Sequence, residues 1–202
     1  LTARKEYVNQ NQQRHLEHQE EYLIKRLKDA GFDSSLVDVR KTSAKKLSKF
    51  NFILNRVFAS VANRDCKSNN RTLKLLKKIE ELGVKCINSH YATRCDYDKF
   101  FSGEVLESKG IRTPKTLLIK HKQDIGRVED FVSVVGLPVI VKRNMGGRAV
   151  NLIKADNLNE AISFLEEEIT NPDEQYCEGY IVQEYVESAL DHDYRISVIG
   201  GD

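Results

Sequence analysis

The stretch from residue 137 to residue 155 (LPVIVKRNMGGRAVNLIKA) combines residue types that can bind a phosphate chain. An apolar run leads into Lys142, the pair Gly146 and Gly147 follows, and a second apolar run comes after the glycines. This pattern predicts two strands joined by a glycine-rich loop that is longer than a tight turn. Glycines let backbone amides come close to a ligand, and Lys142 adds an ammonium group beside them. The plain alternative is a hairpin whose flanking basic residues only aid solubility.

Helices and strands must hold these residues in place, and hydrophobic periodicity predicts where they lie. Helices are expected over residues 17–30, 72–82, 92–109, 125–135 and 157–169. Strands are expected over residues 36–39, 50–57, 84–87, 116–119, 180–186 and 194–199, with a polar loop at 63–70 and a short basic helix or loop at 41–49. The order of elements over the first hundred residues predicts a small α/β unit with a parallel sheet.

Composition limits the classes of function. The chain has 202 residues, of which 40% are apolar and 31% charged, as is usual for one large or two small globular domains. Its 32 basic and 30 acidic residues nearly cancel, so we expect neither nucleic acid nor a membrane surface as a partner. No apolar run approaches the roughly 18 residues that span a bilayer.

The four cysteines form no C-x-x-C pair and have no histidine at zinc-ligand spacing, so we expect reduced thiols and a cytoplasmic location. The chain begins with Leu1 rather than Met and ends at Asp202 directly after a strand-like run, so we expect it to be a fragment.

Six short motifs occur in an order that resembles the ATP-grasp superfamily, and within it the RimK-like (ribosomal protein S6 glutamate ligase) group. They are D-K at 98–99, I-x-x-P-x-T at 111–116, L-P-V-I-V-K at 137–142, G-G at 146–147, I-V-Q-E-Y-V at 181–186 and D-x-R at 193–195. The resemblance covers nearly the whole chain. It implies an α/β fold, α+β in its second part: a pre-ATP-grasp α/β domain over residues 1–98, then an incomplete ATP-grasp domain over residues 99–202. A small nucleotide-covering subdomain is expected at about residues 114–186.

The resemblance also implies roles for the basic residues and the glycine pair. Lys142 corresponds to the lysine that binds nucleotide phosphates, and Lys99 to a second phosphate lysine. Gly146 and Gly147 correspond to the loop that closes over the triphosphate. For Lys99 the alternative is an exposed helix charge that pairs locally with acidic residues.

The strand after this loop is expected to bind the rest of the nucleotide. The segment Gln183, Glu184, Tyr185 and Val186 resembles the linker that recognises adenine, largely through its main chain, although an edge strand with a polar end is an alternative. Asp193 lies at the spacing of an acid near the nucleotide sugar. Arg195 is the candidate catalytic residue, because its guanidinium suits bidentate capture of a carboxylate or phosphate.

The implied function is an ATP-dependent carboxylate-amine ligase that forms an amide through an acylphosphate. The expected partners are ATP, an amino acid such as glutamate, and a peptide or small-molecule carboxylate acceptor, and we expect a homo-oligomer. Mg²⁺ normally bridges the phosphates, and its ligands are expected beyond residue 202. Arg56 is a candidate substrate contact or a simple surface charge. The alternative function is a non-catalytic ATP-binding or interaction module; a Rossmann or P-loop protein is disfavoured because neither motif occurs.

Overall fold

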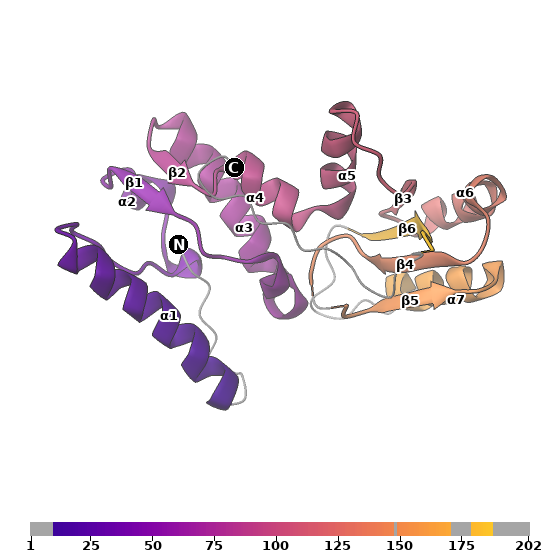
Figure 1. The fold of residues 1–202 in the computed structure, drawn as a ribbon, viewed down its shortest axis with the longest axis horizontal. Coiled ribbons are helices and arrows are strands. Elements are labelled where there is room, and N and C mark those ends of the chain that lie inside the picture. The colour runs from indigo at the N-terminus through magenta and orange to yellow at the C-terminus, as the bar shows by residue number, and fades with distance from the viewer. Residues whose placement is uncertain (1–9, 148, 171–178, 188–202) are drawn as a thin grey trace.

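The computed structural model describes residues 10–147, 149–170 and 179–187, and Figure 1 shows their arrangement. The helices in this part of the chain are α1 (Gln10–Asp29), α2 (Ala44–Leu47), α3 (Ala62–Glu81), α4 (His90–Tyr97), α5 (Lys99–Ser108), α6 (Val128–Val135) and α7 (Leu158–Thr170). The strands are β1 (Phe52–Leu54), β2 (Lys85–Ile87), β3 (Thr116–Ile119), β4 (Val139–Arg143), β5 (Leu152–Ala155) and β6 (Tyr180–Glu184). Two sheets lie toward opposite ends of an elongated molecule, with α5 between them (Figure 1).

The amino-terminal unit has the predicted α/β character. Its strands β1 and β2 pair in parallel, and α3 lies between them in the chain, because parallel strands need a long crossover connection that is usually a helix. Leu76 and Ile79 on α3 are fully buried in one core with Ile53 and Tyr97. The prediction of a small unit with a parallel sheet is therefore confirmed.

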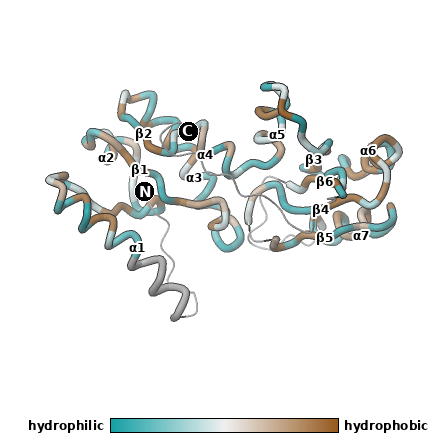
Figure 2. Tube along the Cα trace, in the orientation of Figure 1, coloured by the Kyte–Doolittle hydropathy of each residue, from teal (hydrophilic) through white to brown (hydrophobic). Residues whose placement is uncertain are grey.

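Helix α1 begins earlier than the predicted range of residues 17–30. Three of the seven helical residues ahead of that range are Gln, a good helix former even without an apolar period. Hydrophobic and hydrophilic residues alternate along its described part (Figure 2), as in a helix with one apolar face. No helix in the described part of the chain is both long and apolar enough to cross a membrane.

Two predictions in this unit were wrong. Residues 36–39 form no strand: an extended segment there leads into the 3-10 helix η1 (Val39–Lys41). The predicted polar loop at 63–70 lies within α3 and is helical apart from a break at Asp65 (φ −155°, ψ 70°). Its polar side chains bond within the fold, since the Thr72 hydroxyl donates to the Ser68 carbonyl at 2.7 Å and the Asn69 amide donates to the Phe58 carbonyl at 3.1 Å. A polar sequence can therefore form a buried helix face.

The single helix predicted at 92–109 is in fact two helices. Asp98 has an extended conformation (φ −103°, ψ 100°) that ends α4, and its carboxylate accepts a hydrogen bond from the Phe101 amide at 2.9 Å, which starts α5. Aspartate is a favoured residue at this helix-start position. The break makes Lys99 the first residue of α5 instead of a residue inside a longer helix.

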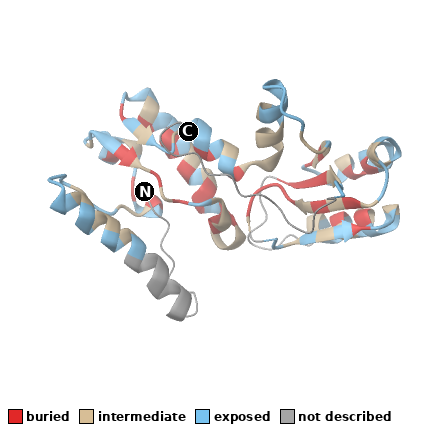
Figure 3. Ribbon diagram, in the orientation of Figure 1, coloured by how far each residue is buried: buried red, intermediate tan, exposed pale blue. Residues whose placement is uncertain are grey.

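The second sheet is antiparallel throughout, with strand order β3-β6-β4-β5. The predicted hairpin around the glycine pair is confirmed, and it aligns Lys142 of β4 with Leu152 of β5. One face of the sheet packs against α6 and α7 through Leu117, Ile119, Val139, Val141, Ala155, Tyr180 and Val182. Figure 3 shows these buried residues along β4 and β6. By the period-two alternation of strands, the opposite face carries Thr116, Leu118, Ile140, Lys142, Leu152, Lys154, Ile181 and Gln183.

The cysteines differ from the prediction at one position. Cys66 is disulfide-bonded, whereas Cys86 and Cys95 are free thiols. The expectation that all four cysteines are reduced is therefore wrong for Cys66. The predicted turn at 171–173 and the strand at 194–199 lie outside the described residues.

Gly179, directly before β6, supplies the first stability prediction. It has φ +78°, and a Cβ added there would lie 2.3 Å from the Ile119 carbonyl oxygen. Gly179→Ala is expected to lower the free energy of unfolding by about 1–3 kcal/mol, because the conformation strains any residue with a side chain. Urea denaturation would measure the loss.

Gly103→Ala is the matched control for this substitution. Gly103 lies inside α5 with no described neighbour within 4 Å of an added Cβ, so alanine there should raise stability by about 0.5–1 kcal/mol. Equal effects of the two substitutions would contradict the tight approach of β6 to Ile119.

Candidate functional site

Two lysines from distant parts of the chain lie near the glycine loop beside the second sheet. Lys142 lies on the sheet face that α6 and α7 leave uncovered, and Lys99 starts α5. Burial and the nearby Lys142 ammonium lower the pKa of Lys99 to about 8, although Asp96 and Asp98 partly oppose that shift. Burial also lowers the pKa of Lys142. Partly desolvated cations that repel each other are poised to bind an anion.

Each ammonium group is oriented by hydrogen bonds. Lys99 Nζ donates to the carbonyls of Asn144 at 3.0 Å and Gly146 at 2.9 Å. Lys142 Nζ donates to Gln183 Oε1 at 2.8 Å, and Gln183 Nε2 in turn donates to Thr116 Oγ1 at 2.9 Å. Lys99 is thus partly buried against the glycine loop, unlike the exposed helix charge considered as an alternative.

Asn144 joins three elements at the start of the glycine loop. Its side chain accepts from the Phe100 amide and donates to Asp98 Oδ1, both at 2.9 Å, and so fixes the start of α5 against the end of β4. Its backbone amide donates to the Gly179 carbonyl at 3.0 Å, just before β6. Lys99 therefore occupies a fixed position relative to Lys142.

The glycine loop itself is attached to the amino-terminal unit. The Asn63 side chain at the start of α3 donates to the Gly147 carbonyl at 2.7 Å, and the Gly147 amide donates back to Asn63 Oδ1 at 3.1 Å. A Cβ on Gly146 would lie 2.5 Å from that same oxygen. Glycine at position 146 is thus required for this close approach.

The end of β6 carries the segment that resembles the adenine linker. The Glu184 carboxylate accepts from the Lys115 amide at 3.0 Å, and its backbone amide donates to the Lys115 carbonyl at 2.9 Å. Tyr185 is 38% exposed, and the Lys154 ammonium lies 4.4 Å from the centre of its ring. Val186 is 61% exposed, so Tyr185 and Val186 both reach solvent.

The uncovered sheet face therefore has both apolar and cationic parts. Leu118, Ile140 and Leu152 supply apolar surface beside Lys142 and Gln183, whose side chains are hydrogen-bonded to each other. A flat, partly apolar ring could lie on such a face while an attached anionic chain reaches the two ammonium groups. The arrangement suits a ligand with a base and a phosphate chain.

The structure thus brings Lys99, Lys142, Gly146, Gly147 and Gln183 together, with Glu184 to Val186 following at the end of β6. Arg148, Asp193 and Arg195 lie outside the described residues.

Sequence reasoning missed Asn63, Asn144 and Lys154 as residues of this site. The hairpin register could have placed Lys154 on the same sheet face as Lys142. Lys154 pairs with Ile140, and Ile140 lies two residues before Lys142 on the same strand, so all three side chains are on one face. No local signal marked Asn63, which meets the loop only through tertiary contact 84 residues along the chain.

The described residues contain no group of three or more His, Cys, Asp or Glu side chains that could hold a metal ion. Magnesium ligands beyond residue 202 stay a prediction.

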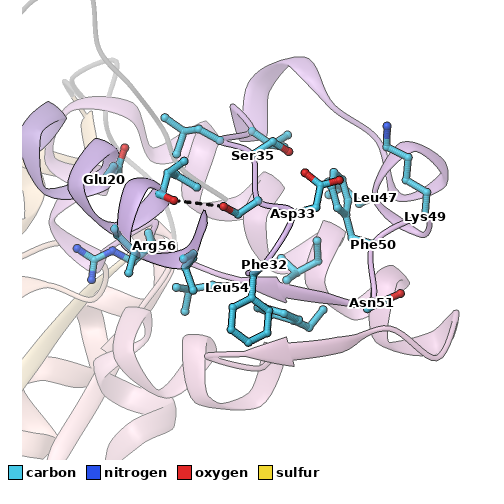
Figure 4. A pocket seen from close by; sticks show the side chains of 18 of the residues that line it. Glu20, Phe32, Asp33, Ser35, Leu47, Lys49, Phe50, Asn51, Leu54 and Arg56 are labelled. Atoms are coloured by element: carbon cyan, nitrogen blue, oxygen red, sulfur yellow. Dashed lines mark hydrogen bonds between the residues drawn. The ribbon is translucent and has the colours of Figure 1, made fainter. Parts of the chain in front are cut away.

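A separate cavity lies in the amino-terminal unit (Figure 4). It has a volume of about 400 Å³ and is lined mainly by apolar residues of α1, of the segment after it and of β1. Figure 4 shows Arg56 and Glu20 at one end and Lys49 at the other. The Arg56 guanidinium stacks on the Phe58 ring at 4.8 Å. Neither Lys99 nor Lys142 lines this cavity, so a substrate contact by Arg56 stays a prediction.

Comparison with solved structures identifies the class of fold. The RimK domain ATP-grasp protein from Sphaerobacter thermophilus DSM 20745 superposes with a TM-score of 0.62 over 93% of this chain and 64% of that chain, at 16% identity. D-cycloserine synthetase DcsG superposes with a TM-score of 0.55 over 81% of this chain and 53% of that one, also at 16% identity. At these identities the likeness shows an ATP-grasp fold and nothing finer.

Sequence comparison then gives the family. The model of the RimK-like ATP-grasp domain matches residues 96–202, which is more than half of the chain. The chain belongs to the RimK-like ATP-grasp family, as its motifs predict.

Two curated relatives show how much of a family member is present. A probable alpha-L-glutamate ligase of Maridesulfovibrio salexigens is 29% identical over 157 residues, which are 77% of this chain and 47% of that protein. The alpha-aminoadipate–LysW ligase LysX of Saccharolobus solfataricus is 32% identical over 136 residues, 67% of this chain and 47% of that protein. The chain thus spans about half the length of these curated relatives.

The closeness of the two lysines can be tested by titration. Lys142→Gln is expected to raise the pKa of Lys99 above its value of about 8, because the substitution removes a neighbouring positive charge. ¹³C NMR of the lysine Cε atoms over a pH series, with the Lys99 signal assigned from a Lys99→Arg variant, would measure the shift. Lys154→Gln is the control, and an equal shift in both variants would contradict a specific pairing.

Proposed function

We propose that this chain is part of an ATP-dependent carboxylate-amine ligase that joins an amino acid, of the glutamate type, to a peptide or small-molecule carboxylate. The observation that carries the proposal is the meeting of two partly buried ammonium groups, Lys99 and Lys142, beside a glycine loop. Membership of the RimK-like ATP-grasp family supports it. The names of the two relatives, a glutamate ligase and an aminoadipate ligase, support an amino-acid substrate.

In this proposal the two lysines bind the triphosphate. Lys142 is held by Gln183 on the uncovered sheet face, and Lys99 approaches from α5, so phosphate oxygens between them would meet a cation on either side. Hydrogen bonds to charged groups are stronger than those between neutral groups, and partial burial strengthens them further. Binding an anion also relieves the mutual repulsion of the lysines.

The remaining residues are assigned to other parts of the nucleotide. The main chain of residues 184–186 would pair with the adenine edge, and the Gly146 and Gly147 amides would cover the phosphates. The Gly147 amide donates to Asn63 in the free protein, so phosphate binding would exchange that partner. Asp193 would accept from the ribose hydroxyls, and Arg195 would hold a carboxylate or phosphate.

The proposed reaction has two steps. A carboxylate oxygen of the acid attacks the terminal phosphorus of ATP, which forms an acylphosphate and releases ADP. An amine nitrogen then attacks the acyl carbon, which forms the amide and releases phosphate. Positioning and neutralisation of the moving phosphate charge are the contributions that the lysines can make. Mg²⁺ would supply further neutralisation through ligands expected beyond residue 202.

The division into domains over residues 1–98 and 99–202, with the nucleotide-covering part at about 114–186, is part of the same proposal. A homo-oligomeric state and a cytoplasmic location stay predictions.

Nucleotide binding by the described site gives the first test. Lys142→Gln should weaken ATP binding by about 1–3 kcal/mol, since a charged hydrogen-bond partner of the phosphates is lost. Isothermal titration of ATP into the chain would measure this. Lys109→Gln, at the exposed end of α5, is the matched control and should bind as the unchanged chain does. Unchanged affinity in Lys142→Gln would remove this residue from the site.

The low pKa of Lys99 predicts how binding depends on pH. Free Lys99 loses its proton as the pH rises through about 8, whereas a bound triphosphate favours the charged form, so binding takes up a proton above pH 8. The dissociation constant for ATP should therefore rise by up to about tenfold per pH unit between pH 8 and 10. In Lys99→Gln the slope should be shallower, and the ligand's own ionisation affects both proteins equally.

Catalysis must be tested on the complete polypeptide, because the chain spans about half of its curated relatives. Continuous ADP release over many turnovers that requires both glutamate and an acceptor carboxylate would support the ligase. Nucleotide binding without turnover across a panel of amino acids would favour the non-catalytic module instead.

A further inference from the structure

Positive charge is concentrated in one part of a nearly neutral chain. Residues 40–79 contain twelve Lys or Arg and a single acidic residue, although the whole chain has a net charge of only +2. Four of these basic residues, Lys67, Arg71, Lys74 and Lys78, are exposed on α3. Their spacing of four, three and four residues places them on one face of the helix.

This basic face forms one wall of a groove between α2 and α3. The groove has a volume of about 700 Å³, and Lys45 on α2 adds a fifth cation to its lining. Among the described residues, those that line the groove include no acidic and no aromatic side chain.

The groove has a fixed wall and uncompensated charges. Arg71 donates to the carbonyls of Val39 at 2.7 Å and Thr42 at 2.6 Å, which ties the segment before α2 to α3. Within the described part of the chain, Lys45, Lys67, Lys74 and Lys78 form no ion pair. Like charges three or four residues apart on a helix repel each other, so a bound anion would stabilise this arrangement.

The spread of the cations indicates an extended ligand. From Lys67 to Lys78 the helix rises by about 16 Å. That length matches about five residues of extended polypeptide. A single phosphate would reach only part of the row, whereas a run of carboxylate side chains could meet all of it.

We propose that this groove binds an acidic peptide segment of the carboxylate acceptor. That the peptide is the acceptor rests on the proposed ligase function. That the groove binds an acidic peptide rests only on the charge and shape of the groove. Nucleic acid fits less well, because single strands are usually held by aromatic side chains on which bases stack, and the described lining of this groove includes none.

The position of the groove agrees with that role. Lys67 follows Asn63 by four residues along α3, and Asn63 holds the glycine loop through Gly147. A break in the helix at Asp65 lies between these two residues, so the groove begins on the part of α3 that follows the break.

Hexaglutamate labelled with a fluorophore is the probe, and fluorescence anisotropy measures its binding to the chain. The unchanged chain should bind hexaglutamate with an affinity that falls steeply with salt, and should bind hexaglutamine at least about tenfold more weakly. The triple variant Lys67→Gln, Lys74→Gln, Lys78→Gln should lose about tenfold in affinity for hexaglutamate. Circular dichroism and thermal unfolding would verify that the variant is folded.

Lys77→Gln is the matched control, since Lys77 is exposed on the same helix but does not line the groove. Equal losses in Lys77→Gln and in a single Lys74→Gln variant would overturn the proposal, because the effect would then be one of net charge. Tighter binding of a single-stranded oligothymidine of matched charge than of hexaglutamate would also overturn it, in favour of a nucleic-acid surface.

ATP titration of the triple variant separates this proposal from the ligase. Unchanged ATP binding with lost peptide binding supports the groove as a distinct site. Peptide binding that persists in the triple variant would refute the groove as the peptide site, whether or not ATP binds. Loss of ATP binding in Lys142→Gln would instead support the proposed nucleotide site and would say nothing about the groove.

Discussion

The approach of two ammonium groups, Lys99 and Lys142, is the constraint on which the site depends. Burial, and then the nearby charge of Lys142, lower the pKa of Lys99, so holding a charged lysine here is unfavourable in the free protein. The fold offsets it with hydrogen bonds from Lys99 to the loop carbonyls and from Lys142 to Gln183. An anionic ligand removes the repulsion, so the feature that destabilises the free protein also favours phosphate binding.

Asparagine side chains hold the parts of this site together. Asn144 joins the start of α5 to the end of β4, and Asn63 joins α3 to the glycine loop through two hydrogen bonds with Gly147. Met145, which lies between Asn144 and Gly147 in the chain, is buried in the core of the amino-terminal unit. The loop that would cover a triphosphate is thus part of the contact between the two units.

Much of the fold could be predicted because local and tertiary preferences agree. The hairpin, β3 and α7 have regular hydrophobic alternation or helical periodicity and a covered apolar face, so pattern and packing specify the same element. Prediction failed where they differ. Residues 63–70 are polar, yet they form a helix because Asn69 and Thr72 find partners inside the fold. The helix predicted through residue 98 breaks because Asp98 caps the next helix with its own side chain.

The sequence by itself determined the family, the strand that carries Lys142 and the glycine pair beside it, because each is encoded by a short run of residues in fixed order. Only the tertiary structure decided that Lys99 meets Lys142 and that Asn63 holds the glycine loop. It also decided that four basic residues of α3 face Lys45 across a groove. These contacts join residues far apart in the chain, and their energies depend on burial and distance, which no local pattern of residue types specifies.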